Sequence, residues 1–432
     1  MQIPELYKLY LQFPSIQTDT RKVKQGDMFF ALKGPNFNGN QFAKEALVKG
    51  AAYAVVDELL ENIDAKIINV PDVLKTLQDL ALHHRTQFST STLTKEIPFI
   101  AVTGSNGKTT SKELIHAVLS STYNTYTTEG NLNNHIGVPL TILKVKQDAE
   151  IAVIEMGANH QKEIASYCAF TLPTHGIITN CGKAHLEGFG GEEGVRKGKG
   201  ELFDHLRISK GMAFIMQDYP YLVGMAKGIP EIMTYGTQSA DITGEVKNSA
   251  GFLEIAITKG ADINDINTQM VGEYNLPNIL AAVAVGKYFN IEEDKIKSAL
   301  ENYIPSNSRS QLVQKGTNRI ILDAYNANPT SMKAAIENFA KMEGGDKVLI
   351  LGSMMELGDE SVAEHQAIID LIGHYTWKAV VLVGGEYNQP ALPYLHFKDA
   401  AEAKLWLHQQ QFDHTQLLIK GSRSIQMEKV LE

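Results

Sequence analysis

The chain has 432 residues, of which 44% are hydrophobic and 21% are charged, a composition typical of an ordered globular protein rather than a disordered one. The chain is longer than a single compact domain usually is, so we expect roughly two to four domains. The net charge of −9 argues against nucleic acid as the main partner, because no basic field would attract phosphates.

The two cysteines, Cys168 and Cys181, cannot form a disulfide framework and lack the spacing of metal ligands. We interpret them as small buried hydrophobic residues in a reducing compartment. No segment has the roughly 18 apolar residues of a membrane span, and the N-terminus lacks the pattern of a signal peptide. We therefore expect a cytoplasmic protein with no membrane association.

The first 90 residues predict a small α/β domain. Residues 1–13 have the apolar spacing of an amphipathic helix, through Ile3, Leu6, Tyr7, Tyr10 and Leu11. Strands are predicted at 27–32 and 52–57, with a helix at 40–50 between them. The stretch from Thr86 to Pro98 is rich in Ser and Thr and ends in proline, which favours a linker.

Residues 96–305 predict a central domain built on a mostly parallel sheet. Apolar, β-branched runs occur at 99–104, 151–157, 175–182 and 211–217. Helical patterns lie between them: one begins near 109, and two others cover 162–169 and 192–206. Such alternation is typical of a parallel sheet covered on both faces. From 241 to 272 only strands are predicted, which indicates an antiparallel patch at the edge of this domain.

A boundary at 304–311 separates a third domain, 306–432. Strand candidates at 319–325, 347–352, 379–384 and 416–421 have helical patterns between them. This arrangement predicts a Rossmann-like, doubly wound sheet. The expected fold class is therefore α/β with three domains.

A candidate phosphate loop, "VTGSNGKTT", joins the first central strand to the helix that follows it. Backbone N–H groups and the helix N-terminus at such a turn favour anions. Lys108 would face the β- and γ-phosphates and the Thr109 hydroxyl would bind Mg²⁺. Val102 stands where the usual phosphate-loop pattern has glycine, so the loop is shorter than in common kinases and GTPases. We expect ATP binding by Gly104, Ser105, Asn106, Gly107, Lys108, Thr109 and Thr110.

The same stretch resembles the nucleotide loop of the Mur ligase superfamily, and further segments resemble that family along nearly the whole chain. These include "TDTRKVKQGDMFFALKG", "EMGANHQKEI", "TNCGKAHLEGFG", "LDAYNANPTSMKAAI" and "LGSMMELG". The resemblance implies three domains, which bind a UDP-sugar substrate, ATP and an incoming amino compound. Their implied order is 1–90, 96–305 and 306–432.

The resemblance also implies a reaction in peptidoglycan precursor synthesis. An ATP-dependent amide ligase of this kind would transfer the γ-phosphoryl group to the carboxylate of a UDP-N-acetylmuramoyl-tripeptide. The amine of D-alanyl-D-alanine would then attack the acyl phosphate and release phosphate. Two anions must be held together, so this chemistry requires metal ions and fixed cations.

Four residues match the catalytic positions of the family. They are Lys108, Glu155 at the end of a strand, His185 in "GKAHLEGF" and Lys199 in "KGKGELF". By resemblance, Glu155, His185 and Thr109 would bind Mg²⁺, and Lys199 would be carbamylated by CO₂ to give an anion that helps bind the second metal ion. Lys197 is a rival for this last role.

Other residues match binding positions of the family. For the nucleotide we expect Asn275, Arg309, Asp323, Tyr325 and Asn326, although Asp323 could also simply cap a helix. For the UDP-sugar peptide and the dipeptide we expect Asp19, Thr20, Arg21, Asn133, Asn134, Lys420, Ser422 and Arg423. Two positions depart from the family pattern, because Asn40 stands where histidine is common and Ser353 where aspartate is frequent.

Several alternatives stay open at this stage. Another ligase of the superfamily, of the amino-acid-adding or folylpolyglutamate type, would share the phosphate loop. A P-loop phosphotransferase or a catalytically inactive scaffold would belong to a different functional class. The expected partners are the two small-molecule substrates, and the expected oligomeric state is a monomer.

Overall fold

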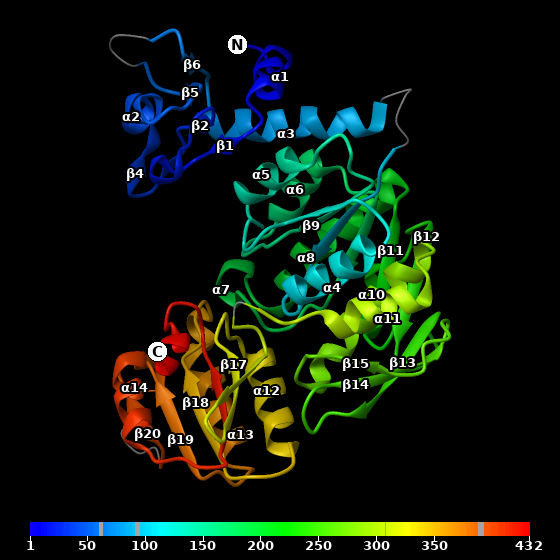
Figure 1. The fold of residues 1–432 in the computed structure, drawn as a ribbon, viewed down its shortest axis with the longest axis vertical. Helices are drawn as coiled ribbons and strands as arrows, with labels where there is room; N and C mark the ends of the chain where they lie inside the picture. Colours follow the sequence, from blue (N-terminus) through cyan, green and yellow to red (C-terminus); the bar gives the residue numbers. More distant parts are fainter. Residues whose placement is uncertain (60–63, 91–95, 307, 388–392) are drawn as a thin grey trace. The chain divides into compact units, whose positions relative to one another are not determined.

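The computed structural model describes residues 1–59, 64–90, 96–306, 308–387 and 393–432 (Figure 1). The chain divides into two compact units. Unit 1 comprises Met1–Ala101, Tyr123–Gly157 and Glu163–His175, and unit 2 comprises Val102–Thr122, Ala158–Lys162 and Gly176–Glu432. None of the helices described is both long enough and apolar enough to cross a membrane.

The N-terminal part of unit 1 contains a four-stranded parallel sheet. Its strand order is β1 (Ile16–Gln17), β2 (Met28–Phe30), β5 (Tyr53–Val56) and β6 (Ile67–Asn69). A short antiparallel hairpin, β3 (Lys33–Gly34) and β4 (Phe37–Asn38), follows β2. Helix α2 (Ala43–Val48) packs Ala43 and Ala46 against Phe29 and Ala54. The two strands and the helix predicted from the sequence are confirmed.

Helices α1 (Ile3–Gln12) and α3 (Val73–Thr90) flank this sheet in the sequence. Helix α1 buries Leu6, Tyr7 and Tyr10, as predicted, whereas Leu11 is 55% exposed, so its prediction as part of the buried face is wrong. Leu11 follows Tyr7 by four residues and therefore lies near it on the helix surface, at the margin of the buried face. His84 of α3 lies 3.0 Å from the Tyr7 hydroxyl and 2.7 Å from the carbonyl of Val145, a structural role.

The prediction of a linker beginning at Thr86 is wrong, because α3 continues to Thr90. Phe88 is buried, and its ring lies 6.0 Å from that of Phe99. Burial of this side chain outweighs the weak helix propensity of the Ser- and Thr-rich sequence. Residues 91–95 of the predicted linker lie outside the described residues.

The central sheet has nine strands. The first five in spatial order are β15 (Ile266–Asn267), β14 (Glu254–Lys259), β13 (Ile242–Asn248), β12 (Glu231–Gly236) and β11 (Met212–Met216). The other four are β10 (His175–Ile178), β7 (Phe99–Thr103), β9 (Ile151–Glu155) and β8 (Thr125–Thr127). The antiparallel pairs β13–β14 and β14–β15 confirm the predicted antiparallel edge.

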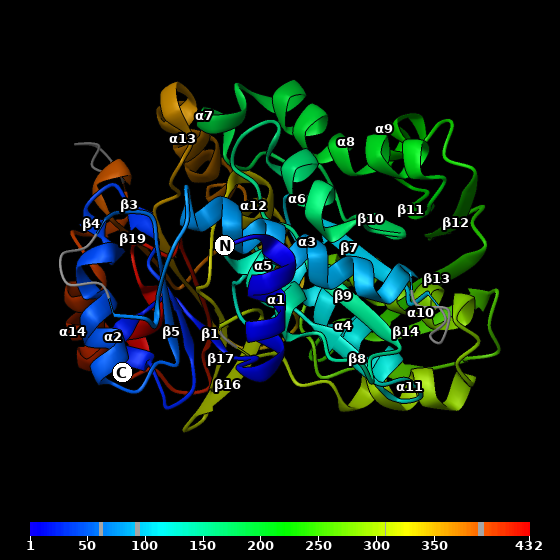
Figure 2. The same ribbon diagram turned by 90° about the horizontal axis from the view of Figure 1, so that it is seen from above.

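Within unit 2, helices cover both faces of this sheet. Figure 2 shows α8 (Glu192–Ser209) and α9 (Pro220–Met225) on one side of β11 and β12, with α10 (Leu276–Tyr288) and α11 (Glu293–Asn302) on the other. Helix α10 is apolar on nearly all sides and packs against α4 (Lys108–Ser120). An all-round apolar helix is expected where it is buried between a sheet and other helices. This packing fixes the helix that carries the phosphate loop.

The C-terminal part of unit 2 contains a six-stranded sheet in the order β16 (Gln311–Lys315), β17 (Asn318–Asp323), β21 (Gln416–Lys420), β18 (Lys347–Gly352), β19 (Ala379–Val383) and β20 (Leu395–Phe397). Only β16 pairs in the antiparallel sense. The intervening helices are α12 (Pro329–Lys341), α13 (Ser361–Ile372) and α14 (Ala400–Gln409). The four predicted strands are confirmed, and β16 and β20 are additional edge strands.

Candidate active site

The phosphate loop lies where predicted, between the end of β7 and the start of α4. Gly107 has φ +78°, and a Cβ atom there would lie 2.4 Å from the Asn278 side-chain oxygen. Gly104 has φ +141°, and a Cβ atom there would lie 2.0 Å from the Thr179 hydroxyl oxygen. Both positions therefore require glycine, for conformation and for space.

Hydrogen bonds to the segment after β10 hold this loop in place. The Ser105 amide donates to the carbonyl of Asn180 at 2.9 Å, and the Asn106 amide donates to the Asn180 side chain at 3.1 Å. The Ser105 hydroxyl donates to the Gly182 carbonyl at 2.8 Å. Thr109 is buried and Thr110 is half-buried. A loop fixed in this way is organised before a ligand arrives, which lowers the entropic cost of binding.

Lys108 is half-buried, and its ammonium group donates to the carbonyls of Gly104 and Ser105 at 2.8 and 3.2 Å. The side chain therefore folds over the loop that it follows. Its position places a fixed positive charge at the N-terminus of α4, where the helix dipole also favours an anion.

Glu155, in unit 1, is the last residue of β9 and is only 1% exposed. Its Oε1 atom accepts a hydrogen bond of 2.7 Å from the Asn133 side chain, and its amide donates to the Thr128 hydroxyl at 2.9 Å. Asn133 was predicted to bind substrate, and the structure places it beside the predicted metal ligand. The neighbouring Asn134 accepts from the Gly137 amide at 2.8 Å, at the start of α5 (Gly137–Lys144).

His185 precedes the short helix α7 (Leu186–Phe189) and adopts φ +53°. Its Nδ1 atom forms an ion pair with Glu356, a residue of the "MMELG" segment. The hydrogen bond from His185 lowers the pKa of Glu356, against the opposing effect of its burial. Glu356 was not singled out from the sequence, although the motif that contains it was.

Lys199 and Lys197 differ sharply in their surroundings. Lys199 is 1% exposed, donates to the Ala158 carbonyl at 2.9 Å and lies 5.0 Å from the centre of the Phe189 ring. Lys197, on the same helix α8, is exposed. Of the two lysines, only Lys199 is therefore placed inside the fold.

Four of the predicted nucleotide residues come together at the end of β17 and the segment before β16. The Arg309 guanidinium carbon lies 3.6 Å from the centre of the Tyr325 ring, a stacked cation–π contact. Asp323 accepts from the Ser310 amide at 3.1 Å and from the Lys420 ammonium at 2.6 Å. Asn326 is exposed beside them.

Asn275 is the fifth predicted nucleotide residue and lies apart from this group. It is buried, its side-chain amide donates to the Val271 carbonyl at 2.9 Å, and its oxygen accepts from Asn278 at 2.9 Å. Asn278 in turn accepts from the Ser111 hydroxyl of α4 at 3.0 Å. These contacts connect Asn275 to the helix behind the phosphate loop.

The predicted dipeptide residues at the end of β21 point in different directions. The Lys420 ammonium contacts Asp323 and also donates to the Asn326 carbonyl at 3.1 Å. The Ser422 hydroxyl donates to the carbonyl of Ser353 at 2.7 Å. Arg423 forms an exposed ion pair of 2.6 Å with Glu428.

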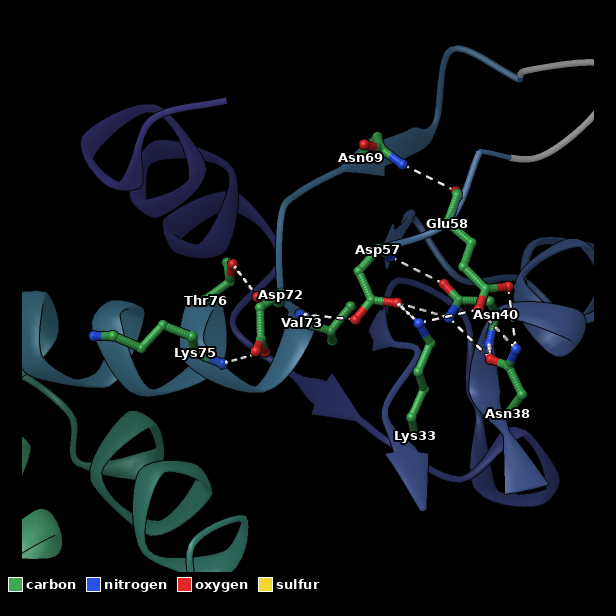
Figure 3. A network of polar contacts seen from close by, with 10 residues as sticks. All are labelled: Lys33, Asn38, Asn40, Asp57, Glu58, Asn69, Asp72, Val73, Lys75 and Thr76. Carbon is green, nitrogen blue, oxygen red and sulfur yellow. Dashed lines mark hydrogen bonds and ion pairs between the residues drawn. The ribbon is translucent and has the colours of Figure 1, made fainter. Parts of the chain in front are cut away.

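In the N-terminal sheet, the predicted residues Asp19, Thr20 and Arg21 follow β1 directly. Arg21 donates two side-chain hydrogen bonds, of 2.9 and 2.8 Å, to the Asp19 carboxylate. These bonds lower the pKa of Asp19 to about 2, so it is an anion throughout the neutral range. Asn40, the departure from the family pattern, is buried in a polar network at the end of β5 (Figure 3).

Comparisons with known proteins cover nearly the whole chain. Models of the Mur ligase family match it in three segments: the catalytic domain over residues 12–85, the middle domain over 102–286 and the glutamate ligase domain over 308–423. UDP-N-acetylmuramoyl-tripeptide–D-alanyl-D-alanine ligase of Escherichia coli K12 is 34% identical over 99% of this chain and 95% of its own. The Bacillus subtilis 168 ligase of the same name is 37% identical over 81% of this chain and 76% of its own.

Solved structures similar to this chain carry the name of the same ligase, MurF. MurF from Acinetobacter baumannii superposes with a TM-score of 0.86 at 31% identity, covering 96% of this chain and 92% of its own. MurF ligase from Thermotoga maritima in complex with ADP superposes with a TM-score of 0.85 at 26% identity, covering 98% of this chain and 97% of its own. The chain belongs to the Mur ligase family.

Proposed function

We propose that this enzyme is an ATP-dependent ligase that joins D-alanyl-D-alanine to UDP-N-acetylmuramoyl-tripeptide in peptidoglycan precursor synthesis. The observation that carries the proposal is the phosphate loop, whose Gly104 and Gly107 leave no room for a side chain and whose Lys108 stands at the start of α4. The choice of substrates is supported by the 34% identity, over 99% of the chain, to the UDP-N-acetylmuramoyl-tripeptide–D-alanyl-D-alanine ligase of Escherichia coli.

The proposed reaction has two balanced steps. A carboxylate oxygen of the tripeptide attacks the γ-phosphorus of ATP, and ADP leaves as the acyl phosphate forms. The free amine of the dipeptide then attacks the acyl carbon and loses one proton to solvent. The amide bond forms, and inorganic phosphate leaves with one former carboxylate oxygen. Lys108 and the backbone amides of the loop would stabilise the charge on the transferred phosphoryl group.

The residues present fit Mg²⁺. Thr109 supplies a buried hydroxyl at the phosphate loop, and Glu155 supplies a buried carboxylate, both oxygen donors of the kind that this ion prefers. Within the described ranges, no group of three or more His, Cys, Asp and Glu gathers as a metal cluster. Magnesium sites commonly use one or two carboxylates together with substrate phosphates and water. We propose Thr109 and Glu155 as ligands on this ground, and His185 on the resemblance to the Mur ligases. When bound, the metal would neutralise phosphate charge.

Lys199 is proposed to act as a carbamate. Its burial, in contrast with the exposure of Lys197, supports the choice between the two lysines. A carbamate would replace the ammonium charge by an anionic oxygen pair, which attracts Mg²⁺ instead of repelling it.

The division of labour between segments is part of the proposal. Residues 1–90 would bind the UDP-sugar peptide, residues 96–305 would bind ATP, and residues 306–432 would bind the dipeptide. The three family matches, at 12–85, 102–286 and 308–423, support this division.

A direct test incubates the purified enzyme with ATP, Mg²⁺ and UDP-N-acetylmuramoyl-tripeptide, with or without D-alanyl-D-alanine. We expect sustained ADP release only when the dipeptide is present, and a product whose mass equals that of both substrates less one water. Offering lysine- and diaminopimelate-containing tripeptides separately identifies the third residue. Turnover without the dipeptide, or a phosphorylated end product, would reject the proposal in favour of a phosphotransferase.

A further inference from the structure

A polar segment follows each of the four parallel strands of the N-terminal sheet, so these segments lie at one edge of the sheet. Asp19 to Arg21 follow β1, the hairpin 33–38 follows β2, Asp57 and Glu58 follow β5, and Asp72 lies shortly after β6. Ligands of parallel α/β sheets bind at the carboxyl ends of the strands. The hairpin therefore lies at the edge where this sheet would hold a ligand, and Figure 3 shows its polar contacts with the residues that follow β5.

The hairpin cannot hold its own position. Its strands β3 and β4 have two residues each, and an isolated hairpin is at best marginally stable even when longer. It also presents the Phe37 ring, which is 56% exposed. Contacts with neighbouring side chains must therefore fix its position.

Asn40 supplies the main contact, through a reciprocal pair of hydrogen bonds with Asp57. Its Nδ2 atom donates to Asp57 Oδ1 at 2.8 Å, and its Oδ1 atom accepts from the Asp57 amide at 3.0 Å. The same Nδ2 atom and the Asn40 amide both donate to the Asn38 side-chain oxygen, at 2.9 and 3.0 Å. Asn40 is 1% exposed, so these bonds are shielded from water and costly to lose.

Lys33 forms a second connection between the hairpin and the end of β5. Its ammonium lies 2.9 Å from Asp57 Oδ1 and 3.0 Å from Glu58 Oε1. Asn38 also donates to Glu58 at 3.0 Å. Both strands of the hairpin are thus joined to the two carboxylates, and Asn40 is the buried member of the network.

The departure from histidine at position 40 has a physical explanation in this geometry. A neutral imidazole offers one N–H donor and one acceptor nitrogen, which matches the two groups of Asp57 that Asn40 contacts. The Asn40 amide offers the same donor and acceptor, and a further N–H that reaches Asn38. It keeps this pattern at every pH, because an amide does not titrate.

We propose that Asn40 is a positioning residue that holds hairpin 33–38 against the β5 end so that the hairpin forms one wall of the UDP-sugar site. This inference rests on the proposed function for the identity of the ligand. Asn40 acts through the hairpin, not by contact with the reacting atoms.

The test compares Asn40→Ala and Asn40→His with Asn69→Ala as the matched control. Asn69 donates to the Glu58 carbonyl at 2.9 Å, at the same sheet edge, and no hydrogen bond described joins its side chain to the hairpin. The measurements are KM for UDP-N-acetylmuramoyl-tripeptide, KM for ATP, kcat, and the Kd of the sugar nucleotide by calorimetry without ATP. A melting curve checks that each variant is folded.

For Asn40→Ala we expect KM and Kd for the sugar nucleotide to rise about tenfold, the range expected from losing hydrogen bonds to a charged group, while kcat and KM for ATP stay within about twofold. At pH 8.5, where imidazole is neutral, Asn40→His should recover most of the affinity. Asn69→Ala should resemble the unmodified enzyme. If Asn40→Ala does not fold, Lys33→Met replaces it as the test, because Lys33 is partly exposed and also joins the hairpin to Asp57. The same rise in KM and Kd for the sugar nucleotide is expected.

A folded Asn40→Ala with unchanged Kd for the sugar nucleotide would overturn the inference, as would an equal loss in Asn69→Ala. Because calorimetry requires no turnover, it also separates this inference from the proposed function. An unmodified enzyme that binds the sugar nucleotide but forms no product would reject the proposed function alone.

Discussion

Lys420 and Asp323 are direct partners in neighbouring parallel strands, β21 and β17, and the ammonium nitrogen lies 2.6 Å from a carboxylate oxygen. The Lys420 side chain is only 2% exposed, and its second contact is the carbonyl of Asn326. The sequence placed Lys420 with the dipeptide and Asp323 with the nucleotide. The structure joins them, and we propose that the charge of Lys420 holds Asp323 in place beside the nucleotide.

We therefore expect Lys420→Met to raise KM for ATP about tenfold and to change KM for the dipeptide much less. Removing one partner of a buried ion pair leaves the other uncompensated, which typically costs about 3 kcal/mol or more of stability, so the melting temperature should also fall. Steady-state kinetics with each substrate varied in turn provides the measurement. Lys378→Met, which removes an exposed ion pair with Asp346, is the control. A rise in KM confined to the dipeptide would instead support dipeptide binding by Lys420.

Replacing Lys108 by alanine should abolish ligation and leave the fold intact. The side chain donates to the loop carbonyls of Gly104 and Ser105, and in the proposed reaction its charge would stabilise the transferred phosphoryl group. We expect a loss of about 10³ or more in kcat, the scale of removing electrostatic stabilisation from a phosphoryl-transfer site. Rate measurements at saturating ATP, with circular dichroism to confirm folding, decide the matter. Activity near that of the unmodified enzyme would remove the phosphate-loop assignment.

The central strands, the phosphate loop and the Rossmann-like domain were predictable because their signals are local. Apolar β-branched runs such as that of β7 and the glycines of the loop are readable residue by residue. The burial of Lys199 and the pairing of Lys420 with Asp323 could not be predicted in this way, because burial and strand register are set by residues far apart in the sequence. The helical residues 86–90 of α3 were missed for the same reason, since Phe88 finds its partner in Phe99.

Lys199→Ala should be nearly inactive, whereas Lys197→Ala should retain most activity. If the missing group is an anionic carbamate, a small carboxylate such as acetate should partly restore Lys199→Ala, because it can occupy the space with an oxygen pair of the same charge. Initial rates at increasing acetate concentration give the measurement. Restoration by a small amine instead, or inactivity confined to Lys197→Ala, would show that the proposed lysine or its charge is wrong.

Stability should fall as the pH drops below about 6.5. Burial lowers the pKa of His175 from 6.5 to about 4, so between these values the unfolded chain binds a proton that the folded chain does not. Stability then rises with pH in this window, and the His175 contribution between pH 7.5 and pH 5 is about 2 kcal/mol. Denaturant unfolding at both pH values measures it. A His175→Gln variant should lose this part of the pH dependence, and an unchanged slope in that variant would contradict the assignment.

Isotope transfer from the tripeptide to phosphate tests the central claim most directly. UDP-N-acetylmuramoyl-tripeptide carrying ¹⁸O in the reacting carboxylate is incubated with ATP, Mg²⁺ and D-alanyl-D-alanine, and the phosphate released is examined by mass spectrometry. Attack of the carboxylate on the γ-phosphorus, followed by attack of the amine on the acyl carbon, predicts one ¹⁸O atom in each inorganic phosphate from doubly labelled substrate. Phosphate without label, released while the amide product accumulates, would contradict an acyl-phosphate mechanism.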